Sequence, residues 1–310
     1  MAKILHGPLQ VSGSEQIGQE KGFREVFGDE NYKQFDFLRL EGELGKGAMN
    51  SSLYGTIADW KPDILWAQLQ DTASIQPQML EKIRQDFPNL WLTQWNGDIR
   101  EVVPVYQSQI GRYFDITYLG FDHQKIYTPH AKRVEIMMIA VDPDEVTIEP
   151  QAKEYDVVFI GNHYDNQFPD TKLRLRLMQV LKEHFNTLVL GNGWPEGISS
   201  GSCPVKEQGK WYAKGKTCIS INHFNNIKYY SERLLWCLAS GTPTIAFKTP
   251  ELEFEDGVHY LGFSDVDECV RHVRNVLKED FDTTKAVEEV ITNHNWTRRA
   301  EQVRRDYEQH

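Results

Sequence analysis

The chain alternates short apolar runs with longer amphipathic stretches, and this alternation occurs twice. In the first half, apolar runs predict strands at residues 3–6, 35–40, 63–68, 90–94, 116–118 and 134–139. Helices are expected between them. The clearest spans residues 78–87, where Met79, Ile83 and Phe87 recur every four positions before Pro88. Strands that alternate with helices are typical of a parallel sheet covered on both faces.

The same pattern begins again at residue 155. Strands are predicted at residues 155–160, 187–190, 217–221 and 244–247, and helices at residues 171–184, 231–240, 265–277 and 285–293. Residues 142–154 are polar and contain Pro143 and Pro150, which is typical of a linker. We therefore predict an α/β fold of two Rossmann-like, doubly wound parallel-sheet domains facing a cleft. They comprise residues 1–141 and 155–296, joined by a linker at 142–154, and residues 297–310 form a C-terminal helix able to cross back to the first domain.

Composition fits two folded domains and argues against several functional classes. Of the 310 residues, 40% are hydrophobic, and the net charge of −11 disfavours broad attraction to nucleic-acid phosphates or an anionic bilayer. No run approaches 18 apolar residues, and besides Met1 residues 1–7 hold only two large apolar side chains, so we expect a cytoplasmic protein without a membrane span or signal peptide. The four cysteines form no CxxC pair, which predicts free thiols and no zinc site.

Positive charge is concentrated in one quarter of this acidic chain. Residues 171–250 contain eleven Lys and Arg against four Glu, a local balance of +7. A solvated basic face would give the same count, but several of these cations flank predicted strand ends, which favours an anionic small ligand. In an open parallel sheet, ligands bind beyond the carboxyl ends of the strands, where helix N-termini present free N–H groups to phosphates.

Three predicted turns lie at such strand ends. In the first, Gly161 allows close approach of the backbone to a ligand, and Asn162 or His163 can donate to a sugar or phosphate oxygen, although an ordinary turn would look the same. The second contains Asn192 and Trp194, and this tryptophan either covers a base or caps the core.

The third turn, residues 229–233, is the most specific. Ser231 is a good helix N-cap, which places Glu232 and Arg233 in the first helical turn, at the positive end of the helix dipole. A cation is unfavourable there unless an anion lies nearby. A pyrophosphate would supply that anion and accept a bidentate guanidinium contact, and the alternative is an ion pair between Arg233 and a neighbouring carboxylate.

Five segments, taken in order, resemble the C-terminal domain of group 1 glycosyltransferases with the GT-B fold, in particular relatives of spore maturation protein B. They are residues 134–143, 158–162, 216–222, 230–243 and 294–299. The resemblance spans about residues 134–305. It implies a nucleoside-diphosphate sugar as co-substrate, with a UDP-sugar favoured, and neither a further cofactor nor a metal. Arg233 and Lys216 would stabilise the charge on the departing diphosphate.

The resemblance implies a donor site built from two loops and one helix N-terminus, with the base near Val205 and Lys206. The expected donor contacts are Gly161, Asn162, His163, Asn192, Val205, Lys206, Tyr230, Ser231, Glu232 and Arg233. Relatives usually carry a ribose-binding glutamate where this chain has Trp236. Either Glu232, one helical turn earlier on the same face, binds the ribose, or donor use is altered, or activity is lost.

The first half matches this family only in layout. Asp98, in a Trp95-Asn96-Gly97-Asp98 turn that resembles one in related enzymes, is a candidate for contact with an acceptor hydroxyl, and N-capping of the next helix is the alternative. His6 ends the first predicted strand and is therefore expected to face the cleft, which makes it the other catalytic candidate of this half.

We therefore expect a metal-independent glycosyltransferase that moves a hexosyl or related group from a nucleotide sugar to a glycan, a small molecule or modified DNA. Retention at the anomeric carbon is implied by the resemblance. Two alternatives stay open. One is a non-catalytic GT-B protein that binds a sugar nucleotide or glycan, which Trp236 favours, and the other is a phage-type enzyme that acts on modified DNA bases.

Overall fold

The computed structural model describes residues 2–11, 16–98, 101–165 and 167–310, which fall into two compact units. Unit 1 is Met1–Met138 with Trp296–His310, and unit 2 is Ile139–Asn295. The segment expected to be a linker, residues 142–154, thus belongs to unit 2. Within it, α7 (Pro143–Val146) is capped by the Asp142 carboxylate, which accepts a hydrogen bond of 3.0 Å from the Asp144 N–H.

Unit 1 is built on a six-stranded, all-parallel sheet in the order β2-β1-β3-β4-β5-β6. Its strands are β1 (Ile4–Gly7), β2 (Tyr32–Gln34), β3 (Ile64–Ala67), β4 (Trp91–Asn96), β5 (Ile116–Leu119) and β6 (Val134–Ile136). Its helices are α1 (Ile17–Phe27), α2 (Phe37–Leu44), α3 (Lys46–Trp60), α4 (Pro77–Asp86), α5 (Val105–Ile110), α6 (Gln124–Tyr127) and α13 (Trp296–Glu308). Short 3-10 turns lie at Asp29–Asn31, Gly111–Tyr113 and Thr128–His130.

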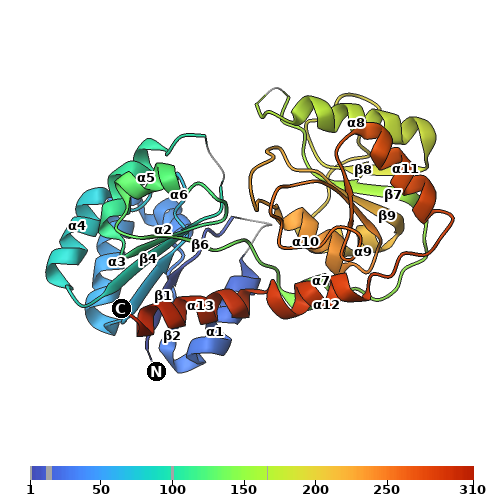
Figure 1. The fold of residues 1–310 in the computed structure, drawn as a ribbon. Coiled ribbons are helices and arrows are strands. Elements are labelled where there is room, and N and C mark those ends of the chain that lie inside the picture. The colour runs from blue at the N-terminus through green and yellow to red at the C-terminus, as the bar shows by residue number, and fades with distance from the viewer. Residues whose placement is uncertain (1, 12–15, 99–100, 166) are drawn as a thin grey trace. The chain divides into compact units, whose positions relative to one another are not determined.

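Helices cover both faces of this sheet (Figure 1). One face buries Leu5, Leu65 and Leu92 against apolar side chains of α2, α3, α4 and α5. On the other face, the C-terminal α13 lies alongside α1. A Cβ on Gly22 would stand 2.6 Å from the backbone carbon of Trp296, so glycine is what lets these two helices approach so closely.

Unit 2 has a five-stranded parallel sheet in the order β11-β10-β9-β7-β8. Its strands are β7 (Tyr155–Ile160), β8 (Thr187–Leu190), β9 (Gly215–Ser220), β10 (Thr244–Phe247) and β11 (Leu261–Phe263). The remaining helices are α8 (Thr171–His184), the 3-10 turn η4 (Val205–Glu207), α9 (Gln208–Ala213), α10 (Glu232–Ala239), α11 (Val266–Val276) and α12 (Thr284–Asn293). Buried apolar side chains of α8 and α11 pack against this sheet.

The two-unit parallel α/β architecture is as predicted, and one predicted element is wrong. Residues 35–40 do not form a strand: β2 ends at Gln34, and α2 begins at Phe37. The Asp36 carboxylate accepts from the Arg39 N–H at 3.1 Å and so caps α2, which is the local interaction that decides for helix. The strand predicted at 134–139 ends at Ile136. Within the described residues, no helix is both long enough and apolar enough to cross a membrane.

Candidate functional site

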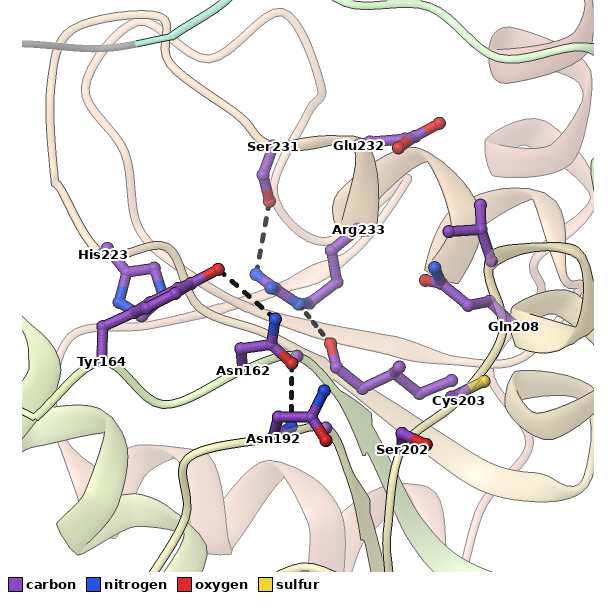
Figure 2. Close-up of a pocket in the computed structure, with 14 residues that line it drawn as sticks. Asn162, Tyr164, Asn192, Ser202, Cys203, Gln208, His223, Ser231, Glu232 and Arg233 are labelled. Atoms are coloured by element: carbon purple, nitrogen blue, oxygen red, sulfur yellow. Dashed lines mark hydrogen bonds between the residues drawn. The ribbon is translucent and has the colours of Figure 1, made fainter. Parts of the chain in front are cut away.

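A cavity opens in unit 2 where the order of the strands reverses. The chain leaves β7 to form β8 on one side and returns to form β9 on the other, and such a switch point leaves a crevice at the carboxyl ends of the strands. The cavity there has a volume of about 360 Å³, which lies in the range of small-molecule sites. Its lining, drawn in Figure 2, consists of Ile160, Gly161, Asn162, Tyr164, Gly191, Asn192, Ser202, Cys203, Val205, Gln208, His223, Ser231, Glu232 and Arg233.

The guanidinium of Arg233 is fixed by the ends of two strands. Nε donates to the Ile160 carbonyl at 2.6 Å, and Nη1 donates to the Ile221 carbonyl at 3.0 Å. Nη1 also donates to Ser231 Oγ at 3.3 Å (Figure 2). No carboxylate in the described part of the chain forms an ion pair with it, so the alternative of a structural salt bridge does not hold. The charge of Arg233 is therefore available to a ligand in the cavity.

The N-terminus of α10 adds to this positive charge. Ser231 occupies the N-cap position, as predicted, but its hydroxyl accepts from Arg233 and makes no capping hydrogen bond to the helix backbone. The first N–H groups of α10 are thus left without a side-chain cap beside the cavity. Uncapped N–H groups at the positive end of a helix dipole are a favourable place for a phosphate oxygen.

Sequence reasoning missed a second guanidinium, that of Arg174 in α8. A Cβ on Gly161 would stand 2.2 Å from Arg174 Nη2 and 2.5 Å from Arg233 Nη2, so both guanidiniums converge on this glycine from different helices. The sequence held one signal for it. Arg174 lies three residues before Leu177 and seven before Leu181, on the apolar face of the helix, where a charge is unexpected.

Two asparagines join the loops at the carboxyl ends of β7 and β8. The Asn162 side-chain carbonyl accepts from the Asn192 N–H at 2.8 Å, and both residues line the cavity. His163 points elsewhere: it is buried, with its ring centroid 5.0 Å from that of Trp194. Trp194 packs edge-on against Phe159 and donates its indole N–H to the Gly161 carbonyl at 2.8 Å, so it caps the core and does not line the cavity.

Three further residues of the expected donor site lie outside the cavity. Lys216 is the second residue of β9, at the amino edge of the sheet, and its Nζ pairs with Asp156 Oδ1 at 2.9 Å. Tyr230 is buried, and its hydroxyl lies 2.9 Å from His294 Nδ1. Lys206 is exposed on η4, whereas its neighbour Val205 does line the cavity. The expected role of Lys216 at the phosphates is therefore corrected.

Four of the eleven cations counted in residues 171–250 are balanced by ion pairs in the fold. Lys214, Lys216, Lys228 and Lys248 each form an ion pair with a carboxylate from a different part of unit 2. Those carboxylates are Glu154, Asp156, Glu251, Asp256 and Glu268. The positive field that remains at the cavity comes from Arg174, Arg233 and the helix N-terminus.

Trp236 occupies the position where the resemblance implies a ribose-binding glutamate, and its side chain does not line the cavity. Its side chain is 2% exposed, and a Cβ on Gly209 would stand 3.2 Å from its ring, so it fills the space between α10 and α9. Glu232, one turn earlier, does line the cavity together with Gln208. Burial raises the pKa of Glu232 to about 7; the neighbouring Trp236 side chain opposes this shift, and the nearby charge of Glu145 adds to it.

Replacing Glu232 by glutamine is expected to flatten the dependence of stability on pH. A carboxyl whose pKa rises from 4.5 to about 7 on folding binds a proton that the unfolded chain releases, so the free energy of unfolding falls as pH rises through this window. Urea denaturation at pH 4.5 and 7.5 measures the fall. An equal fall in the wild type and in Glu232→Gln would show that another group is responsible.

The two catalytic candidates of unit 1, His6 and Asp98, lie in different surroundings. His6 was expected to face an open cleft, but it is fully buried against Phe23 of α1, with Tyr32 Oη 2.8 Å from Nδ1 and Gln19 Oε1 3.2 Å from Nε2. Burial lowers its pKa to about 3, so it is a neutral core residue. Asp98 follows β4, and Pro104, not Asp98, is the N-cap residue of the next described helix, α5. Residues 99–100 lie outside the described residues.

Comparisons with known proteins point in one direction. Residues 174–305, fewer than half of the chain, match the model of a family described as Glycosyl transferase-like. Comparison with curated proteins gives no match. Among solved structures, sucrose-phosphate synthase from Thermosynechococcus elongatus is similar with a TM-score of 0.67 at 10% identity, over 99% of this chain and 98% of that one.

Two further structures are similar over nearly their full lengths. Anabaena HepE, solved in complex with UDP-glucose, has a TM-score of 0.66 at 10% identity, with all of both chains covered. The lipopolysaccharide outer core galactosyltransferase WaaB has a TM-score of 0.61 at 11% identity, over 98% of this chain and 99% of that one. At such identities the likeness shows the fold, which is that of GT-B glycosyltransferases. Together with the family match, which includes both Arg174 and Arg233, the fold supports a GT-B glycosyltransferase.

Proposed function

We propose that this protein transfers a sugar from a nucleoside-diphosphate donor to an acceptor, and that unit 2 binds the donor. The observation that carries the proposal is the guanidinium of Arg233, held by main-chain carbonyls in a cavity at the strand switch point and free of any carboxylate among the described residues. A diphosphate is the group of a sugar nucleotide that such a site fits, because it can accept from both the guanidinium and the N–H groups at the start of α10.

The chemistry follows from where charge develops. As the bond between the sugar and the diphosphate breaks, negative charge grows on the leaving oxygen. Arg233 and the dipole of α10 are fixed beside the cavity and stabilise that charge without further reorganisation. They supply the positive charge that a metal supplies in other transferases, so we propose a reaction that needs no metal. Lys216 takes no part, because its ion pair with Asp156 lies at the opposite edge of the sheet.

The remaining lining of the cavity suits the rest of a nucleotide. Val205 offers an apolar contact for a base, and Glu232 and Gln208 offer hydrogen-bonding groups for ribose hydroxyls. The UDP-glucose bound to Anabaena HepE supports a UDP-sugar as the first donor to test. Retention at the anomeric carbon and Asp98 as an acceptor contact stay predictions. A DNA acceptor gains no support from the comparisons.

A panel of nucleotide sugars tests the proposal directly. With candidate acceptor sugars present, we expect the purified protein to transfer the sugar of one donor to an acceptor hydroxyl, which loses its proton, and to release the nucleoside diphosphate in the presence of chelator. UDP-glucose and UDP-galactose are tried first. The measurement is coupled detection of the diphosphate over time, with NMR of the product to read the configuration at the anomeric carbon. Release that requires added divalent metal would contradict the metal-free mechanism.

The second candidate is a non-catalytic protein that binds a sugar nucleotide. The position of Trp236, which removes the implied ribose contact from the cavity, favours it. A pure binder would be stabilised against heat by a sugar nucleotide, because a ligand that binds only the folded state raises the melting temperature, yet it would release no diphosphate. Both readouts on the same donor panel separate the two functions.

A further inference from the structure

Arg174 carries a positive charge in the interior of unit 2 that no carboxylate balances. Its side chain is fully buried, and Nε and Nη2 have no hydrogen-bond partner in the described part of the chain. Its third nitrogen, Nη1, donates to Nε2 of His223. No ion pair joins Arg174 to any of the carboxylates that the structure describes. Unpaired buried charges are costly, and a native protein that keeps one generally has a ligand for it.

The partner of Arg174 does not neutralise it. An arginine N–H can only donate, so His223 Nε2 must accept and the ring must be neutral. Burial, together with the charges of Arg174 and Arg233, lowers the pKa of His223 to about 3, with only the backbone of Asn162 acting in the other direction. Asp170, one helical turn before Arg174, contacts only its main chain: the Asp170 carbonyl accepts from the Arg174 backbone N–H at 3.0 Å, and no hydrogen bond or ion pair joins the Asp170 carboxylate to the guanidinium.

A second positive charge lies immediately beside the first. The guanidiniums of Arg174 and Arg233 both lie over the ring of Phe159, at 4.7 and 5.2 Å from its centroid, and both reach the space that a Cβ on Gly161 would occupy. The other ionisable groups that face Arg174 are the phenols of Tyr164, Tyr212 and Tyr229, and none of them is a carboxylate. Two cations that repel each other are thus held together by a ring, a neutral imidazole and backbone carbonyls.

We propose that the counter-ion of Arg174 is the diphosphate of the ligand, and that Arg174 is a positioning residue that strengthens diphosphate binding through Arg233 and Gly161 without touching the ligand. The identification of this anion as a diphosphate rests on the proposed function. The requirement for a multiply charged anion rests on the two guanidiniums alone. An unpaired buried charge lowers the stability of the ligand-free protein, and the same charge raises the affinity for the diphosphate. Arg174 therefore affects stability and affinity in opposite directions.

The test is Arg174→Met, which keeps the length of the side chain and removes its charge, with inorganic diphosphate and UDP as the probes. We expect the melting temperature of the ligand-free variant to rise by about 2 °C or more, because an unpaired buried charge is lost. We expect its affinity for both probes, measured by calorimetry, to fall about tenfold or more. Arg174→Lys, which restores a charge, should regain part of that affinity. Arg176→Met, an exposed arginine on the same helix, should change neither quantity.

Affinities within twofold of wild type in Arg174→Met would overturn the proposal, whatever the melting temperature does, since a structural role alone leaves anion binding in place. Should the methionine variant fail to fold, Arg174→Gln is judged by the same affinity criterion. The outcome is separable from that of the proposed function. Binding of inorganic diphosphate that depends on Arg174, without turnover of any sugar nucleotide, would support this inference and contradict the proposed transferase function. Turnover with an affinity independent of Arg174 would do the reverse.

Discussion

Replacing Arg233 by alanine is expected to lower the turnover of the donor by about 10²-fold or more while the protein stays folded. The guanidinium is a cation that lines the cavity from the start of α10 and is held there by hydrogen bonds to two strand-end carbonyls. Its loss removes positive charge where the departing diphosphate becomes negative. The measurement is turnover at saturating donor, with circular dichroism to verify the fold.

The matched control for this variant is Arg271→Ala. Arg271 is an exposed arginine of α11 in the same unit, and it lies outside the cavity. We expect its turnover to equal that of the wild type. Normal turnover in Arg233→Ala would mean that the phosphate site has been assigned to the wrong residue.

A side chain at position 161 is expected to damage the site as severely as the loss of Arg233. In Gly161→Ala, the new Cβ would stand 2.2 and 2.5 Å from the ends of Arg174 and Arg233, so both guanidiniums must leave their present positions. We expect the affinity for UDP to fall by about 10²-fold, because Arg233 loses a charge-assisted contact worth roughly 1.5 kcal/mol or more and the charge of Arg174 no longer supports that contact. Calorimetric titration with UDP measures the loss.

Gly42→Ala in α2 is the control for this substitution, because a Cβ there meets no atom within 4 Å. It should leave the affinity for UDP unchanged. If Gly161→Ala also bound UDP as the wild type does, the two arginines would not be acting together at this glycine.

The sequence predicted the strands of unit 2 well where apolar runs end at glycine or proline. The runs at β7, β8 and β10 consist mainly of buried apolar residues, and Gly161 and Gly191 directly follow β7 and β8. The three-residue edge strand β11 was missed, because so short a run has no readable period. Residues 35–40 were wrongly predicted as a strand because they contain an apolar run. In the structure, the Asp36 carboxylate caps the N-terminus of α2, and this residue pattern forms a helix.

The residues of the candidate site that lie in turns directly after strands could be predicted from the sequence. Gly161, Asn162, Asn192 and Arg233 were identified in this way, and all of them line the cavity. Lys216 was placed at the phosphates by resemblance alone, although its position before a strand already indicated the other edge of the sheet.

Residues whose role depends on distant partners could not be predicted. The ion pairs that balance the cationic segment join residues far apart in sequence, such as Lys216 and Asp156. The burial of His6 depends on α1 folding over β1, which brings Phe23 and Gln19 against its ring. Arg174 was counted among the basic residues but not recognised, because only the fold shows that it has no carboxylate partner among the described residues and that it meets Arg233 at Gly161.

The most direct measurement is a crystal structure of the protein with UDP bound. The account predicts phosphate oxygens within hydrogen-bond distance of the guanidinium at position 233 and of the first N–H groups of α10, with the uracil toward Val205. A nucleotide seated elsewhere in unit 2, or in unit 1, with this cavity filled only by water, would contradict it.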